Sequence, residues 1–251
     1  MIKGKKYFKH ISLFLLFSIT ISVVYLYSPY KIEGIGYYNK IWAHRVNSLE
    51  KLDSALNYFE GVELDLIYNE ENNILDVNHT LGESISLSFE TYLKAIPSNT
   101  YPYLWLDIKM LNKDNADLIL KRLVHLFKER KYPLENVLIE ALQPEALPVF
   151  KEQGFKISYY LPPKLYLKDA NDLRNSIDEI KRVIVSQPNI AMSTDYRNYK
   201  IIKAHFPDQK KYIWAITRMA NYSEYTKIRD ILKDETVNVV LLKYRALKGN
   251  R

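Results

Sequence analysis

The stretch "GVELDLIYNEENNILDVNH" (residues 61–79) places two carboxylates and a histidine in one short extended segment. Its first half alternates with a period of two, which predicts a strand that turns Glu63 and Asp65 to one side and Leu64 and Leu66 to the other. Two like charges that close repel each other unless something positive lies between them. The stretch therefore raises the question of which positive group this strand serves.

The same strand pattern recurs along the chain and alternates with helical patterns. Strands are expected at 41–45, 61–68, 103–110, 136–142, 156–162, 189–195, 212–217 and 237–244, with an extended excursion at 74–79. Helices are expected at 48–59, 86–96, 114–130, 144–153, 170–182, 196–205 and 221–234. Eight strands separated by helices in a chain of 251 residues predict a (β/α)8 TIM barrel. A doubly wound open sheet is the alternative, but no Gly-rich phosphate loop supports it.

The N-terminus differs from the rest of the chain. Four lysines precede the uncharged run "ISLFLLFSITISVVYLY" (11–27), which is at the short end for a membrane span, and no small-x-small cleavage site follows it. We therefore expect the barrel to be preceded by an N-terminal membrane-spanning helix, an uncleaved signal anchor in residues 1–30. A linker at 31–40 and the barrel at 41–251 follow. The basic flank would stay in the cytoplasm, so the barrel would be extracytoplasmic.

Composition narrows the class of ligand. The formal net charge is +7, but four of the positive charges belong to the N-terminal segment. No lysine–arginine stripe with interleaved aromatic residues is present, so we expect no binding to nucleic acid. The chain has no cysteine, which excludes both a lipoprotein anchor and a thiolate zinc site.

The barrel itself predicts where the site lies, because the loops at the C-terminal ends of the strands build it. On the third strand, alternation points Asp107 and Lys109 inward, next to Glu63 and Asp65 on the second. Three carboxylates from neighbouring strands would then converge. A hard divalent cation with oxygen ligands, Mg²⁺ or Ca²⁺, is the natural group to neutralise them. We therefore predict that Glu63, Asp65 and Asp107 hold one metal ion.

Two histidines lie beside the predicted metal: His44 ends the first strand and His79 follows the excursion. A pair of imidazoles flanking a metal-bound phosphate can act as general base and general acid. Arg45 and Lys109 either contact the phosphate oxygens or hold the carboxylates in place.

Three further residues are candidates for substrate binding, each with a structural alternative. Asn47 belongs to the site or caps the first helix after the anchor. Glu140 reaches the mouth from the fourth strand or pairs with a lysine in a loop. Trp214 forms a wall of the pocket or is part of the core.

In order along the chain, these residues read His-Arg (44–45), Glu-x-Asp (63–65), a histidine at 79 and Asp-x-Lys (107–109). This order resembles the motifs "HRG…ENT", "E-x-D", "HD" and "E-x-K" of the glycerophosphodiester phosphodiesterase family, one of the phospholipase C-like phosphodiesterase barrels. The resemblance covers residues 42–109 motif by motif. It implies a phosphodiester hydrolase that uses one divalent ion, held by the three carboxylates, and the two histidines as its acid–base pair.

The chain departs from the family pattern at three places. "HRVNS" (44–48) replaces the longer "HRG…ENT", "NHT" (78–80) puts Thr80 where the family has an acid, and Asp107 replaces the usual glutamate. "WAHRVNS" (42–48) resembles the menorin-like branch of the superfamily more closely.

The expected function is hydrolysis of glycerophosphodiester or lysophospholipid-like substrates. The alternative is a catalytically degenerate barrel that binds a phosphorylated lipid or glycan head group. A glycoside hydrolase is a weaker third possibility, since its two acids should lie on well-separated strands.

Overall fold

The chain is described here by a computed structural model, which covers residues 2–79, 84–215 and 222–245. Eight parallel strands form the barrel: β1 (Ile41–His44), β2 (Gly61–Asn69), β4 (Tyr103–Lys109), β5 (Val137–Ala141), β6 (Lys156–Tyr160), β7 (Ala191–Asp195), β8 (Lys211–Ala215) and β9 (Val237–Lys243). The barrel closes because β1 pairs in parallel with both β9 and β2. The predicted TIM barrel is thus confirmed, and the open doubly wound sheet is excluded.

The predicted excursion after the second strand is β3 (Ile74–Val77), which pairs antiparallel with β2. In this hairpin β2 continues past Ile67, where its pairing with β4 ends, and His79 follows two residues after β3. The last two residues of the strand predicted at 212–217 lie outside the described residues, as does the first residue of the helix predicted at 221–234.

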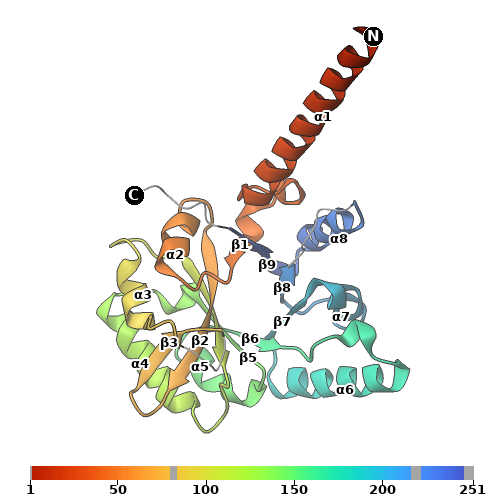
Figure 1. Cartoon of the computed structure of the whole chain (residues 1–251). Coiled ribbons are helices and arrows are strands. Elements are labelled where there is room, and N and C mark those ends of the chain that lie inside the picture. The colour runs from red at the N-terminus through yellow and green to blue at the C-terminus, as the bar shows by residue number, and fades with distance from the viewer. Residues whose placement is uncertain (1, 80–83, 216–221, 246–251) are drawn as a thin grey trace.

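Helices follow the strands and surround the barrel (Figure 1). They are α2 (Leu49–Ala55), α3 (Phe89–Ala95), α4 (Ala116–Glu129), α5 (Pro148–Glu152), α6 (Ala170–Ser186), α7 (Tyr199–His205) and α8 (Tyr222–Lys233). Two predicted helices begin later than expected, because 3₁₀ turns at Pro144–Ala146 and Tyr196–Asn198 precede them. Proline at the first position of α5 explains the restart there, since its fixed backbone angle suits a helix start.

The strand faces separate two environments. The outward faces pack against the helices and form the main apolar core, which includes Leu64 and Leu66 of β2. The inward faces fill the lower barrel with a second cluster that contains Trp42, Trp105 and Tyr212. Charged side chains occupy the inward positions nearer the C-terminal ends of the strands. The barrel is therefore solid at its base and polar at its mouth, as the fold requires for a site.

Helix α1 (Ile2–Tyr27) projects away from the barrel (Figure 1). Its large apolar side chains between Ile11 and Val23 are exposed. Within the described parts of the chain, no helix has both the length and the apolar character that crossing a membrane requires. The structure therefore does not support the predicted membrane-spanning segment in residues 1–30. The residues predicted as a linker form two 3₁₀ turns, Ile32–Gly34 and Tyr38–Lys40.

Candidate functional site

The three predicted metal ligands meet at the mouth of the barrel. Glu63 and Asp65 lie on the inward face of β2, and Asp107 lies directly opposite Asp65 in the parallel register of β2 with β4. One carboxylate oxygen from each residue lies within 4.8 Å of the others. Glu63 and Asp65 are buried and Asp107 is half-buried. The convergence expected from strand alternation is therefore present.

The electrostatics of this cluster are those of crowded like charges. Burial and the neighbouring Asp65 carboxylate raise the pKa of Glu63 well above its ordinary value. Burial also raises the pKa of Asp107, although Lys109 opposes the shift. Burial alone would raise the pKa of Asp65 too, but the charge and hydrogen bond of Lys109 and the hydrogen bond from Asn47 outweigh it and lower the pKa. The cluster therefore contains one carboxylate that is held ionised and two that resist ionisation.

Lys109 supplies the only positive charge that lies between these acids in the described structure. Its Nζ lies 2.8 Å from Asp65 Oδ1 and also contacts Asp107 Oδ2. The two carboxylates in turn raise the pKa of Lys109 against the effect of burial. The cluster thus has three carboxyl groups and one ammonium, and every atom that could bind a metal ion is a carboxylate oxygen. The residues therefore fit a hard divalent cation by charge and by ligand type.

Asn47 bonds to a residue of the carboxylate cluster and does not cap α2. Its amide nitrogen donates to Asp65 Oδ2 at 2.7 Å, and its amide oxygen accepts from the backbone N–H of Asp65 at 3.0 Å. The cap of α2 is instead Ser48, whose hydroxyl accepts from the N–H of Lys51. Asn47 thus fixes the carboxylate of Asp65 from the side opposite Lys109.

The turn after β1 directs a backbone donor at the cluster. Arg45 has a positive φ of 52°, in the left-handed region that non-glycine residues rarely adopt. Its N–H donates to Glu63 Oε2 at 2.6 Å, and His44 Nε2 lies 3.7 Å from the same oxygen. Burial, reinforced by the charge of Arg45, lowers the pKa of His44 to about 3. His44 is therefore a neutral imidazole at neutral pH.

His79 and the side chain of Arg45 lie on the exposed rim of the mouth. Arg45 Nη2 lies 2.5 Å from His79 Nε2. A guanidinium can only donate, so this nitrogen of His79 accepts and its proton, when neutral, is on Nδ1. The contact places both predicted residues at one side of the cluster. Thr80, which stands where the family has an acid, lies outside the described residues.

Glu140 and Trp214 line the same cavity, which has a volume of about 110 Å³ and also contains the three acids and both histidines. Trp214 is half-buried, and its ring stacks on Tyr160 with the centroids 4.8 Å apart. Glu140 is buried, and its Oε1 has no hydrogen-bond partner within the described residues. Burial, and then the charge of Asp107, raises the pKa of Glu140. The alternative pairing of Glu140 with a loop lysine is not observed in the described structure.

Four residues of this region were not predicted from the sequence. Trp105, Tyr160 and Leu241 line the cavity. Trp105 could have been found, because it shares the inward face of its strand with Asp107. Lys51 of α2 donates to the carbonyl oxygens of His44, at 2.7 Å, and of Arg45, at 2.6 Å. Nothing in the sequence shows that this lysine turns back to the β1 turn, where burial lowers its pKa to about 8.

Comparison with known proteins shows the fold. No family model matches the chain, and no curated protein matches it in sequence. Solved structures do match: a protein of Galdieria sulphuraria, provisionally named a glycerophosphodiester phosphodiesterase, has a TM-score of 0.58 and 18% identity, covering 82% of this chain and 94% of that one. The glycerophosphodiester phosphodiesterase of Thermotoga maritima has a TM-score of 0.52 and 15% identity, covering 81% and 93%.

A third structure, a phosphodiesterase of Oleispira antarctica, was solved in complex with its product sn-glycerol-3-phosphate. It has a TM-score of 0.53 and 13% identity, covering 84% of this chain and 95% of that one. These similarities extend over nearly the whole length of each relative. At such low identity they establish a shared barrel fold, and the activity has to be argued from the site.

Proposed function

We propose that this protein is a metal-dependent phosphodiester hydrolase that acts on glycerophosphodiester or lysophospholipid-like substrates. The observation that carries the proposal is the cluster of Glu63, Asp65 and Asp107, whose oxygens lie within 4.8 Å of one another at the mouth of the barrel. His44, Arg45 and His79 surround this cluster in the same cavity. The barrel shared with glycerophosphodiester phosphodiesterases supports the same reaction class.

The three carboxylates would hold one divalent cation, Mg²⁺ or Ca²⁺, which when bound neutralises the charge of the phosphate. The remaining chemistry belongs to the side chains. One imidazole removes the proton of the attacking hydroxyl as the new P–O bond forms. The other donates a proton to the leaving alcohol oxygen as the old P–O bond breaks. A neighbouring hydroxyl of the substrate, such as one of glycerol, can attack in place of water and give a cyclic phosphate first.

Several other residues have roles in this scheme that follow from their contacts. Arg45 and Lys109 contribute cations for the phosphate oxygens, because both lie at the cluster. Asn47 positions a predicted metal ligand through its two hydrogen bonds to Asp65. Trp214 with Tyr160 provides an aromatic wall for the alcohol part of the substrate, and Glu140 closes the polar base of the cavity.

The test is a turnover assay on glycerophosphodiesters and lysophospholipids with Mg²⁺, with Ca²⁺ and with a chelator. We expect a metal-dependent product, and we expect His44→Ala and His79→Ala each to lower turnover by about 10²- to 10⁴-fold. His125→Ala is the matched control, because His125 is exposed on α4, does not line the candidate cavity, and has its one ion pair within the described structure with Glu129. Unchanged turnover in both site variants would refute the assignment.

One observation favours a second candidate, a barrel that binds a phosphorylated lipid or glycan head group without cleaving it. Lys109 bridges Asp65 and Asp107, where it partly substitutes for a cation. Binding of glycerophosphodiesters without product under any metal, and equally strong with a chelator, would favour this candidate. Binding that needs the metal and leads to product favours the hydrolase.

A further inference from the structure

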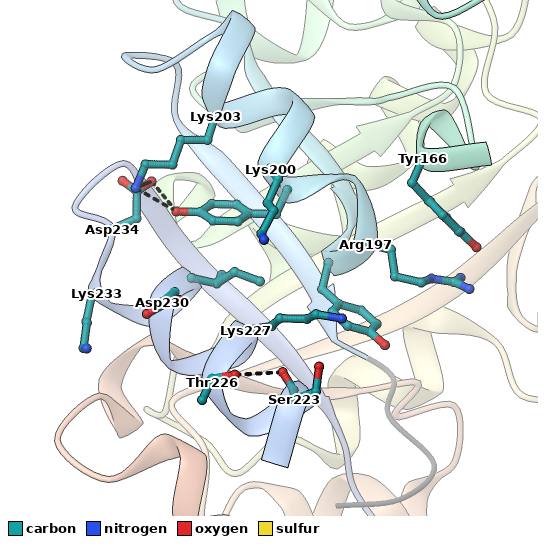
Figure 2. Close-up of a pocket in the computed structure, with 13 residues that line it drawn as sticks. Tyr166, Arg197, Lys200, Lys203, Ser223, Thr226, Lys227, Asp230, Lys233 and Asp234 are labelled. Atoms are coloured by element: carbon teal, nitrogen blue, oxygen red, sulfur yellow. Dashed lines mark hydrogen bonds and ion pairs between the residues drawn. The ribbon is translucent and has the colours of Figure 1, made fainter. Parts of the chain in front are cut away.

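A second and larger cavity lies on the outside of the barrel, between α7 and α8 (Figure 2). Its volume is about 960 Å³, at the upper end of the range of roughly 300–1,000 Å³ that is common for small-molecule sites. The turn after β7 and the segment after β6 complete its walls through Arg197 and Tyr166. No described residue lines both this groove and the candidate catalytic cavity. It is a separate site.

The groove is positively charged. Its walls carry five basic side chains, namely Arg197, Lys200, Lys203, Lys227 and Lys233, against two carboxylates. Two of the five are already paired: Lys203 lies 3.4 Å from Asp234, and Arg197 is held by Asp195 through bonds of 2.7 and 2.9 Å.

The other three lysines have no ion pair among the described residues, and all three are exposed. Figure 2 shows Lys200 of α7 and Lys227 of α8 directed toward the space between the two helices. Asp230 is the single wall carboxylate that no described basic group pairs with, so it offsets one of the three charges. The groove thus keeps an uncompensated positive charge that an anionic ligand would neutralise.

The walls also supply rigid planar surfaces. The guanidinium of Arg197 stacks over the ring of Tyr166, 4.6 Å from its centroid. The hydroxyl of Tyr199 donates to Asp234 at 2.7 Å, and that of Tyr196 donates to Glu224 at 3.1 Å. These bonds hold the tyrosine rings in place. The groove therefore combines ordered aromatic walls with exposed lysine side chains. The lysines can bind phosphate by charge, and the aromatic rings can contact a non-phosphate part of the ligand.

We propose that the α7–α8 groove binds a ligand that carries more than one phosphate group. Lys200 of α7 and Lys227 of α8 enter the space from its two helical walls, and Arg197 lines it beside them. The volume is several times that of a single phosphate, so two or more phosphates fit among these cations. This site takes its ligand by charge, with no role in the chemistry at the metal cluster.

Calorimetric titration of the full-length protein tests the proposal with two probes, inorganic triphosphate and an oligomer of glycerol phosphate. A chelator is present so that no cation at the carboxylate cluster contributes. We expect at least one probe to bind. The double variant Lys200→Ala with Lys227→Ala should weaken that binding by at least about ten-fold, because each substitution removes a charge-assisted contact with phosphate. Lys200→Arg with Lys227→Arg should preserve it. The probe that binds shows whether the phosphates belong to a free oligophosphate or to a phosphodiester-linked chain.

The matched control is Lys121→Ala with Lys128→Ala, two exposed lysines of α4 whose removal changes the net charge equally. This pair should leave binding unchanged. Equal weakening in both double variants would show attraction by net charge alone and overturn the proposal. The proposal would also be overturned if neither probe bound, or if the Lys200→Ala with Lys227→Ala variant bound a probe as tightly as the wild type does. None of these results depends on turnover, so the hydrolase assignment stands or fails independently.

Discussion

Asn47 is a single side chain that holds one carboxylate of the cluster in place. It donates to the carboxylate of Asp65 and accepts from the backbone N–H of the same residue. We predict that Asn47→Ala weakens metal binding by about 10- to 100-fold, as the loss of groups that orient a metal ligand typically does. Titration of the metal into the purified variant measures the effect.

Ser48→Ala separates this effect from loss of the helix start. Ser48 caps α2 and contacts none of the three carboxylates in the described structure. Its removal should lower the free energy of unfolding by about 1 kcal/mol and leave metal affinity as it was. Similar metal affinities in the two variants would contradict the role given to Asn47.

His44 provides a pH dependence at the same scale. Its pKa is lowered from 6.5 to about 3 by burial and by Arg45, so the unfolded chain binds the extra proton between these two values. His44 thus contributes stability that is complete above pH 6.5 and is lost as the pH falls toward 3, at up to about 1.4 kcal/mol per pH unit. Urea unfolding in the presence of a chelator should show that the free energy of unfolding of the wild type falls relative to that of His44→Gln as the pH falls from 6.5 toward 3. Parallel pH profiles would contradict the prediction.

At the scale of elements, Gly61 of β2 leaves room for the ring of Trp42 of β1 at the base of the barrel. A Cβ atom at this buried position would collide with the ring of Trp42, which fills the barrel interior. We predict that Gly61→Ala destabilises the protein by about 1–3 kcal/mol through overpacking. Chemical denaturation of Gly61→Ala, Trp42→Leu and the double variant tests this. The destabilisation by Gly61→Ala should be smaller in the Trp42→Leu background, because leucine removes the ring with which the new Cβ collides. Strictly additive changes in the free energy of unfolding would exclude the collision as the cause.

At the scale of the whole molecule, α1 and the barrel are separate in their packing. None of the three apolar clusters contains a described side chain of α1. A described contact of α1 is made by Tyr25, whose hydroxyl donates to both oxygens of the Glu33 carboxylate, in the turn before the barrel, at 3.0 Å. We predict that a chain beginning at Tyr25 unfolds at the same temperature as the full chain, within about 2 °C given the size scaling of thermal shifts. Circular dichroism on heating measures this, and a clear drop would show that α1 stabilises the barrel.

Much of this molecule could be predicted from local patterns. Alternating strands and helical repeats identified all eight barrel strands, and inward alternation identified Glu63, Asp65 and Asp107 as one cluster. These succeed because a strand turns alternate side chains to opposite faces whatever its neighbours are, and because parallel strands end at one rim. The structure does not support the predicted membrane-spanning helix, which was inferred from a run of uncharged residues behind four lysines.

The sequence by itself thus determined the barrel and the residue types at its mouth, since both follow from period and order along the chain. Only the tertiary structure decided which side chains contact one another. It placed Lys109 between Asp65 and Asp107, joined Asn47 to Asp65, and turned Lys51 back onto the β1 turn. It also assembled the basic groove from α7 and α8. Such contacts depend on side-chain directions and on distances between elements, and neither is encoded in the spacing of residues along one strand or helix.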